Sequence, residues 1–280
     1  MIRKIYNAIK RRVVARLPKR IVQVPVRVPV FQNELLKGRV ALITGGTSGI
    51  GFAMAREFCD SGARVIITGR SQDRIDAALT GLKSDQSYGI VLDNRNVDEF
   101  AQMIDRIEHD FGNPDILVNN AGVINCKTFG AVEPDNYDDI LNANLKGAFF
   151  LSQEIANRWI KSGIKGNILN VGSSSSLRPG NSPYVLSKWG VRSMTIGLAK
   201  ALIKHGIVVN GIAPGPTATK MFVGDGTNGI NWPKNPAGRL ATEEEIANLA
   251  LVLVSDMGRM VVGDMLFVTG GSGVITVDDL

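Results

Sequence analysis

The chain has 280 residues, 44% hydrophobic and 21% charged, which suits one α/β domain with an appendage better than two full domains. Two cysteines and two histidines exclude a disulfide framework and a zinc site, so we expect no metal and a reducing, cytoplasmic location. Residues 1–37 hold ten basic residues and one acidic residue, a net charge of +9, whereas the other 22 basic and 25 acidic residues give −3. The pI of 9.4 therefore belongs to the N-terminus and does not indicate nucleic-acid binding.

The first predicted element is a basic amphipathic helix over residues 2–17, because apolar residues recur at steps of three and four among basic ones. Pro18 ends this helix. Residues 22–30 are predicted to be an extended arm, since Pro25 and Pro29 exclude a helix and remove hydrogen-bond donors. Residues 1–37 thus form a basic segment in front of the folded body.

Three roles for this basic segment stay open. The first is a solvated or subunit-packing arm. The second is a peripheral contact of residues 1–20 with an anionic membrane, and the third is an organelle-targeting presequence or a contact with an acidic protein. No apolar run reaches the roughly 20 residues that span a bilayer. The lack of serine in residues 1–20 argues against a transit peptide.

From Arg39 onward, short apolar runs alternate with stretches of helical periodicity. Strands buried on both faces are expected near 40–43, 64–68, 89–92, 115–118, 167–171, 206–210 and 265–268. Helices are expected between them, including long ones over roughly 134–161 and 184–204. Right-handed crossovers then make residues 38–280 a single doubly wound, Rossmann-like parallel sheet with helices on both faces. The Gly-, Pro- and Asn-rich stretch 211–240 is predicted to be a mobile substrate lid.

A glycine-rich turn joins the first predicted strand to the first helix of the body. Its glycines allow a tight turn and expose the amides of a helix N-terminus, which carries partial positive charge and suits a pyrophosphate. Between a buried strand and a helix, such a turn is a strong indication of a dinucleotide site. The predicted cofactor contacts here are Gly45, Thr47, Ser48, Gly49, Ile50 and Gly51.

The end of the second predicted strand distinguishes NAD from NADP. An acidic residue there would bind the adenosine ribose, but this chain has Gly69 and Arg70. Because a guanidinium can hold a 2′-phosphate with two hydrogen bonds, Arg70 favours NADP over NAD. The alternative is that Arg70 is a solvated turn residue.

At this point the sequence resembles the short-chain dehydrogenase/reductase family over about residues 37–273. Five motifs in the family's order carry the resemblance: the TGxxxGxG turn at 44–51, NNAG at 119–122, YxxxK at 184–188, Pro-Gly at 214–215 and Gly-Gly at 270–271. Each motif is weak alone, and Tyr6 with Lys10 makes a coincidental YxxxK. Together they are specific, and they imply a nicotinamide-dependent oxidoreductase that assembles as a homo-oligomer, a dimer or tetramer.

Tyr184 and Lys188 are the predicted proton-transfer pair. Four residues apart on a helix, they share a face. Tyrosine has an ordinary pKa of about 10, and a nearby ammonium is expected to lower it toward the working pH. The resemblance also implies that Lys188 holds the nicotinamide ribose.

The sequence offers three candidates for the serine partner. The family commonly places this serine thirteen residues before the tyrosine, which here is Val171, so the match from the strand end selects Ser173 and a loop two residues short. Ser174 and Ser175 are alternatives. Asn144 matches the family asparagine that helps to hold a water linking to the lysine, with Asn142 as the neighbouring alternative.

Other cofactor contacts follow from the resemblance by position. Asp93 matches the residue that meets the adenine, although it could instead be a helix N-cap. The remaining implied contacts line the adenosine side or the carboxamide: Asn120, Ala121, Gly122, Pro214, Gly215, Thr217 and Thr219.

These residues predict NADP-dependent hydride transfer between the nicotinamide and a secondary alcohol or its ketone. A 3-oxoacyl-carrier-protein reductase is a narrower alternative, because residues 236–240 and the general outline resemble that subgroup. A non-catalytic NADP-binding sensor or scaffold is another. Substrate contacts are expected from 123–130, 174–183 and 211–240, with Trp232 and Phe222 as apolar candidates, and the sequence does not identify the substrate.

Overall fold

The computed structural model describes residues 32–125, 127–219 and 229–275. Residues 1–31, which carry the predicted amphipathic helix and proline-rich arm, lie outside the described residues, as do 220–228 with Phe222 from the predicted lid. None of the helices in the described ranges has the length and hydropathy that a bilayer crossing needs.

Seven parallel strands form one sheet with the order β3-β2-β1-β4-β5-β6-β7. Their bounds are β1 Val40–Ile43, β2 Arg64–Gly69, β3 Ser87–Val91, β4 Ile116–Asn119, β5 Asn167–Val171, β6 Val208–Pro214 and β7 Met265–Val268. The order reverses its direction at β1, where β2 and β4 pair on opposite sides. The predicted doubly wound, Rossmann-like fold is therefore confirmed.

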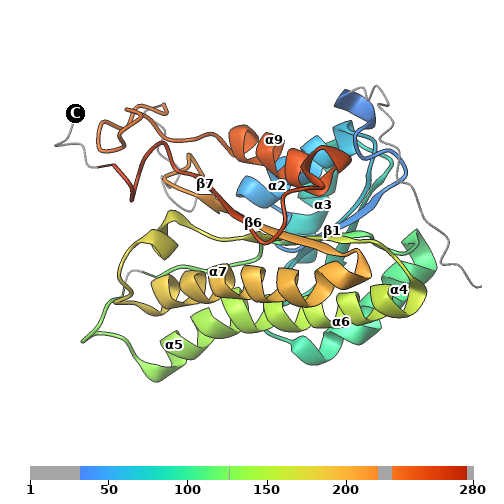
Figure 1. Ribbon diagram of the computed structural model, residues 1–280, viewed down its shortest axis with the longest axis horizontal. Helices are drawn as coiled ribbons and strands as arrows, with labels where there is room; N and C mark the ends of the chain where they lie inside the picture. Colours follow the sequence, from blue (N-terminus) through green and yellow to red (C-terminus); the bar gives the residue numbers. More distant parts are fainter. Residues whose placement is uncertain (1–31, 126, 220–228, 276–280) are drawn as a thin grey trace, which may run out of the picture. The chain divides into compact units, whose positions relative to one another are not determined.

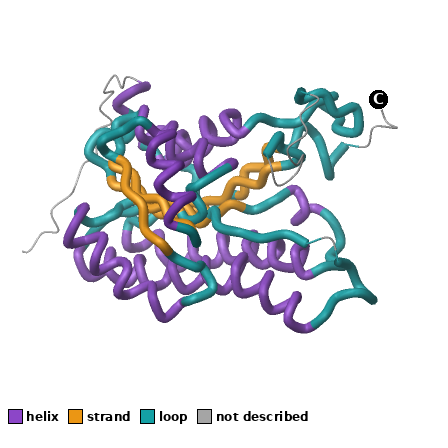
Figure 2. The backbone as a smooth tube through the Cα atoms, turned by 180° about the vertical axis from the view of Figure 1, so that it is seen from behind, coloured by secondary structure: helices purple, strands orange, loops and turns teal. Residues whose placement is uncertain are grey.

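Helices cover both faces of the sheet (Figures 1 and 2). On one face lie α2 Gly49–Asp60, α3 Gln72–Leu82 and α9 Glu243–Val254; on the other lie α4 Phe100–Phe111, α5 Pro134–Leu141, α6 Gly147–Ser162 and α7 Pro183–Leu202. Short turns η1 Gln32–Glu34, η2 Val97–Glu99, η4 Ser174–Leu177, η5 Ile203–His205 and η6 Asp256–Gly258 are 3-10 helices, and η3 Asn142–Lys146 is a π-helical turn.

Alternation along each strand divides the core into two layers. In β1, Ala41 and Ile43 pack with the helices α2 and α9, whereas Leu42 packs toward α4 and α6. All three are fully buried, as expected for a strand with helices on both faces. Leu36, which the sequence analysis placed in the arm, is also fully buried and donates its amide to Ser61 O at 2.9 Å, so the body begins before residue 38.

Two differences from the prediction bear on the candidate site. The sixth strand continues through Pro214, so the first residues of the predicted lid belong to the buried sheet. The helical stretch predicted over 134–161 is continuous, but its middle is the π turn η3. Both differences lie next to candidate site residues, Gly215 and Asn144.

Candidate active site

The candidate site lies at the carboxyl edge of the sheet, where the segments after β1, β2, β4, β5 and β6 meet. This is where an open parallel sheet binds ligands, next to the point at which the strand order reverses. The glycine turn, the NNAG motif and the Pro-Gly motif lie at the ends of β1, β4 and β6, and the YxxxK motif lies in the first turns of α7.

The glycine turn after β1 is held by Asn120. Its Nδ2 donates to Thr44 O at 2.9 Å and Gly45 O at 3.0 Å. Gly45 has a φ of +65°, and a Cβ added at Gly51 would lie 2.3 Å from Asn120 Nδ2. The side chain of Asn120 therefore supports the turn, while Ala121, whose amide donates to Thr44 Oγ1 at 3.0 Å, packs against Gly45.

The start of α2 fits a pyrophosphate. Its N-cap, Ser48, makes no side-chain capping hydrogen bond, and the first turn of the helix carries no acidic residue. A Cβ added at Gly49 would find nothing closer than 3.8 Å, so the backbone of Gly49 is not crowded by its neighbours Glu243 and Thr219. Free amides at a positively polarised helix end are the features that bind phosphate groups.

Arg70 and Asp93 come together beside this turn. Arg70 is exposed at the end of β2, next to Thr47, whose Cγ2 would lie 2.6 Å from a Cβ on Gly69. Asp93 accepts from Arg95 Nη2 at 2.6 Å and from the Arg95 amide at 3.0 Å. These bonds from Arg95, with a smaller contribution from Arg70, hold the pKa of Asp93 below its usual value. Arg95 was not identified from the sequence, and its guanidinium is paired with both Asp93 at 2.6 Å and Asp139 at 2.8 Å.

Asp93 is not the N-cap of the helical turn that follows it, so the alternative role considered for this residue is wrong. The residue at the N-cap of η2 is Asn96. Asp93 instead closes a local turn by accepting the amide two residues later.

Tyr184 and Lys188 lie at the start of α7. Ser182 caps this helix by accepting from the Val185 amide at 3.3 Å, and Pro183 occupies its first turn. Lys188 is 6% exposed, donates to Val171 O at 2.9 Å, and places Nζ 5.8 Å from the centroid of the Tyr184 ring. The predicted pair therefore shares one helix face.

The electrostatics of this pair differ from the expectation. Burial raises the pKa of Tyr184, and the hydrogen bond with the Ser173 side chain opposes this shift. Burial also lowers the pKa of the Lys188 amine, to about 8 from its ordinary 10.5. The lysine is thus prepared for proton exchange near neutral pH.

Ser173 follows β5 and faces Tyr184. Its Oγ accepts from the Ser175 amide at 3.1 Å, which leaves the hydroxyl proton for donation. Ser174 is 7% exposed and belongs to the 3-10 turn η4, and Ser175 supplies only its backbone to this bond. The structure therefore brings Ser173, of the three candidate serines, to the tyrosine.

Asn144 lies in the π turn η3 and is 2% exposed. It accepts from the Val123 amide at 2.7 Å and donates to Val123 O at 2.9 Å and Ser187 Oγ at 3.1 Å. A Cβ added at Gly122 would lie 3.2 Å from Asn144 Oδ1 and 3.8 Å from Lys188 Nζ. Asn144, Gly122 and Lys188 therefore meet, whereas Asn142 is only partly buried.

The two candidate threonines, Thr217 and Thr219, both follow β6 but have different surroundings. Gly215 donates to Val268 O at 2.9 Å and has no room for a Cβ, which would lie 2.7 Å from Thr269 Cα. Thr217 is 4% exposed and its hydroxyl donates to Gly215 O at 2.9 Å, so it supports the Pro214–Gly215 turn. Thr219 instead lies beside the glycine turn, with Cγ2 3.8 Å from the Cβ position of Gly49.

A buried polar chain behind the site escaped the sequence analysis. Asn119 Nδ2 donates to Ser152 Oγ and Asn170 Oδ1, both at 2.8 Å, and Asn170 Nδ2 donates to Thr195 Oγ1 at 3.0 Å. This series of hydrogen bonds links β4 and β5 to each other and to α6 and α7. Only the asparagines inside two otherwise apolar strands could have signalled it.

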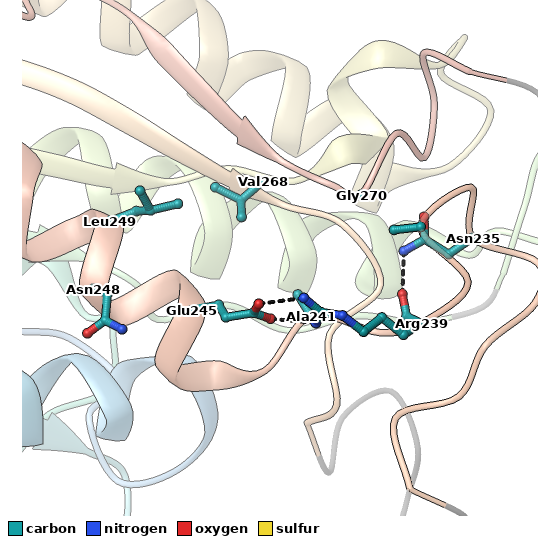
Figure 3. A pocket seen from close by; sticks show the side chains of 9 residues that line it. Asn235, Arg239, Ala241, Glu245, Asn248, Leu249, Val268 and Gly270 are labelled. Atoms are coloured by element: carbon teal, nitrogen blue, oxygen red, sulfur yellow. Dashed lines mark hydrogen bonds and ion pairs between the residues drawn. The ribbon is translucent and has the colours of Figure 1, made fainter.

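A hollow of about 350 Å³ lies elsewhere, between the end of β7, the start of α9 and the 235–241 segment (Figure 3). Asn235 donates to Arg239 O at 2.7 Å, and Arg239 pairs with Glu245 at 2.6 Å on its wall. Three of its lining residues, Asn235, Ala237 and Arg239, belong to the 211–240 stretch from which substrate contacts were expected, and none of them is a predicted catalytic residue.

Comparison with known proteins agrees with this geometry. The family model for short chain dehydrogenases matches residues 39–228. The chain belongs to the short-chain dehydrogenase family. This confirms the resemblance and makes the protein an oxidoreductase of a family that uses nicotinamide cofactors.

Three relatives illustrate the range of the family. The chain is 36% identical over 250 residues to a 3alpha-hydroxysteroid dehydrogenase of Mediterraneibacter gnavus, covering 85% of this chain and 98% of the relative. It is 35% identical over 240 residues to a 3-oxoacyl-[acyl-carrier-protein] reductase of Haemophilus influenzae, covering 84% and 98%. The crystal structure of a gluconate 5-dehydrogenase from Burkholderia cenocepacia in complex with NADP and tartrate is 33% identical, with a TM-score of 0.78 and coverage of 86% and 97%.

Proposed function

We propose that this protein is an NADP-dependent oxidoreductase that transfers a hydride between the nicotinamide and a secondary alcohol or its ketone. The observation that carries the proposal is the Tyr184 phenol, hydrogen-bonded to Ser173 and one helical turn from Lys188, beside a turn that fits a pyrophosphate. Gly45, Ser48, Gly49, Ile50 and Gly51 would hold the phosphates.

The proposed roles follow from the hydrogen bonds. The bound nicotinamide supplies or accepts the hydride. Ser173 donates to the substrate oxygen, because its Oγ already accepts from the Ser175 amide. Tyr184 gives its phenolic proton to the oxygen when a ketone is reduced and takes the proton back when an alcohol is oxidised. Lys188, with a pKa of about 8, restores the proton of Tyr184 near neutral pH.

Asn144 completes this arrangement. Its two bonds to Val123 and its bond to Ser187 fix the amide next to Gly122 and the Lys188 amine. Asn144 lies in a π turn, a helix distortion often found at functional sites. We propose that Asn144 holds the proton path to Lys188.

The decisive test is Tyr184→Phe. The variant should lose turnover, with kcat lower by about 10³-fold or more, while its NADPH dissociation constant stays within about twofold because the phosphate turn is untouched. Retained turnover in a folded Tyr184→Phe protein contradicts the proposed chemistry. Cofactor binding with no turnover of any carbonyl by the unaltered protein would instead favour a sensor or scaffold.

The NADP preference is proposed from charge. Arg70 carries an exposed guanidinium at the end of β2, whereas the guanidinium of Arg95 is paired with both Asp93 and Asp139. Arg70→Asp should reverse the preference toward NAD in kcat/KM, and Arg74→Asp, the same charge change at an exposed position of α3, should not. Higher kcat/KM with NADH than with NADPH in the unaltered protein would refute the preference.

The substrate class requires a screen. The relatives named above act, by their names, on steroids, acyl-carrier-protein thioesters and gluconate. NADPH oxidation should be followed with ketosteroids, 3-oxoacyl thioesters and keto sugar acids in parallel. A strong preference for a 3-oxoacyl thioester would support the narrower reductase proposal.

A second copy of the chain is proposed to cover the apolar faces of α6 and α7, which lie side by side (Figure 1). Phe149, Phe150, Leu186, Trp189 and Ile196 are each 40% to 54% exposed there. Ile196→Glu should give a smaller particle by light scattering. Met260→Glu, which alters a 93% exposed residue outside these helices, should not.

We further propose a peripheral contact of residues 1–20 with anionic membranes in a cytoplasmic protein, on the charge of that segment. A shortened protein beginning at Phe31 keeps the buried Leu36 and is the fair comparison. Equal sedimentation of both proteins with anionic vesicles would remove this proposal.

A further inference from the structure

The position of Ser173 depends on the turn that follows it. The carbonyl of Ser173 accepts from the Ser176 amide at 3.0 Å and from Ser176 Oγ at 2.8 Å. Ser176 is fully buried, so this end of the turn is fixed inside the protein. Any displacement of Ser176 would therefore move Ser173.

Arg192 holds Ser176 from the helix that carries Tyr184 and Lys188. Its Nη1 donates to Ser176 O at 2.9 Å. Arg192 follows Lys188 by one helical turn, so the arginine and the lysine lie on the same side of α7. The serine turn and the proton-transfer pair are thereby tied to one element.

The guanidinium of Arg192 is itself fixed between two aromatic rings. Its Cζ lies 5.3 Å from the ring centroid of Trp189 on α7 and 5.2 Å from that of Phe267 on β7. Both distances allow cation–π attraction. Trp189 also donates through Nε1 to Arg178 O at 2.7 Å, which holds the far end of the serine turn. Helix α7, turn η4 and strand β7 are thus joined at one arginine.

We propose that Arg192 is the positioning residue that holds Ser173 in line with Tyr184. The inference rests on the proposed function, because it assigns Ser173 a role in turnover. Arg192 bonds Ser176 and lies against the rings of Trp189 and Phe267, and it reaches Ser173 through Ser176. It was not identified from the sequence, since nothing in the YxxxK motif marks the eighth residue after the tyrosine.

The test is a double-mutant cycle with Arg192→Ala, Ser173→Ala and the combination, measured as kcat and as the NADPH dissociation constant. Arg192→Ala should lower kcat about tenfold, because small misplacements of a catalytic group are costly. NADPH binding should stay within about twofold. In the Ser173→Ala background, the same change should lower kcat less than about twofold, since the group that Arg192 positions is gone.

Two further variants separate positioning from a loss of folding. Arg192→Lys keeps a donor for Ser176 O and should recover part of kcat, and Phe267→Leu removes one ring while keeping the donor and should lower kcat only a few-fold. Arg158→Ala is the matched control, because Arg158 pairs with Asp105, Glu108 and Glu154 away from the site and its loss should leave kcat unchanged.

The outcomes distinguish this inference from the proposed function. If Ser173→Ala has full activity, the assigned role of Ser173 fails. If Ser173→Ala is impaired but Arg192→Ala is fully active, or lowers kcat equally in both backgrounds, the positioning role of Arg192 is overturned and the proposed function stands.

Discussion

Glu243 places a negative charge beside the turn that we assign to the cofactor phosphates. A Cβ added at Gly49 would lie 3.8 Å from Glu243 Oε1. Arg56, on the facing helix α2, is bound by Glu244 at 2.7 Å rather than by Glu243. Burial, and then the charge of Glu244, raises the pKa of Glu243 above its ordinary value of 4.5, and Arg56 opposes this.

We predict that Glu243→Gln binds NADP more tightly than the unaltered protein. Two unit charges ~6 Å apart repel by about 0.7 kcal/mol at the dielectric constant of water and about 2.8 kcal/mol at an effective value of 20. Because Glu243 is partly exposed, the lower part of this range applies. An NADP dissociation constant about five times smaller, roughly 1 kcal/mol, is expected.

Calorimetric titration with NADP at low salt, where screening is weak, measures this difference. The advantage of Glu243→Gln should be present above the raised pKa of the carboxyl and disappear as the pH falls through it, because Glu243 then becomes neutral. Comparing two proteins at each pH cancels the titration of NADP itself. Glu244→Gln, whose carboxylate faces Arg56, is the control. Equal or weaker binding by Glu243→Gln at neutral pH refutes the reasoning.

Three other predictions concern stability. Lys188→Met should lose turnover yet raise Tm at pH 7, because burial opposes the charged amine and lowers its pKa from the ordinary 10.5 to about 8. In the unaltered protein, the free energy of unfolding should rise between pH 8 and pH 10.5. In Lys188→Met this rise should be absent. The hydrogen bond with Arg239 is the largest cause that lowers the pKa of Glu245, to about 2. The stability that the Glu245 carboxylate contributes should therefore be present above its ordinary pKa of 4.5 and be lost as the pH falls toward 2. In urea denaturation, Glu245→Gln should not show this loss of stability at low pH. Trp159→Phe removes a bond of 2.6 Å to Pro114 O and should lower the free energy of unfolding by about 2 kcal/mol in urea denaturation.

The sequence predicted the sheet well, because its strands are buried on both faces and therefore appear as apolar runs. The first strand matched at 40–43 and the last at 265–268. The prediction of strand ends failed where a buried strand continues through residues that usually end strands. Gly211 and Pro214 suggested a loop, yet β6 runs through both, because a glycine there fits the close approach of Met265 and proline is tolerated at the end of a strand.

The placement of candidate residues that directly follow strands was also predictable, since the carboxyl ends of parallel strands meet at one edge. Side chains from distant segments were not. Arg95, Arg192 and Glu243 reach the site through tertiary contacts, and their local sequence resembles any charged surface. The π turn around Asn144 has no signature in the apolar pattern, because one added residue in a helix disturbs the 3.6-residue period only locally.

The short serine loop shows how such tertiary contacts decide a question that spacing leaves open. The family's usual spacing selects Val171, whose side chain is 8% exposed and whose carbonyl holds the Lys188 amine at 2.9 Å. Two residues later, Ser173 hydrogen-bonds Tyr184. This shortened loop is held at the end of its first turn, where Arg192 donates to Ser176 O and Trp189 donates to Arg178 O. Lengthening this loop by two residues should therefore make kcat less sensitive to Arg192→Ala, because the longer chain no longer needs the arginine to place Ser173.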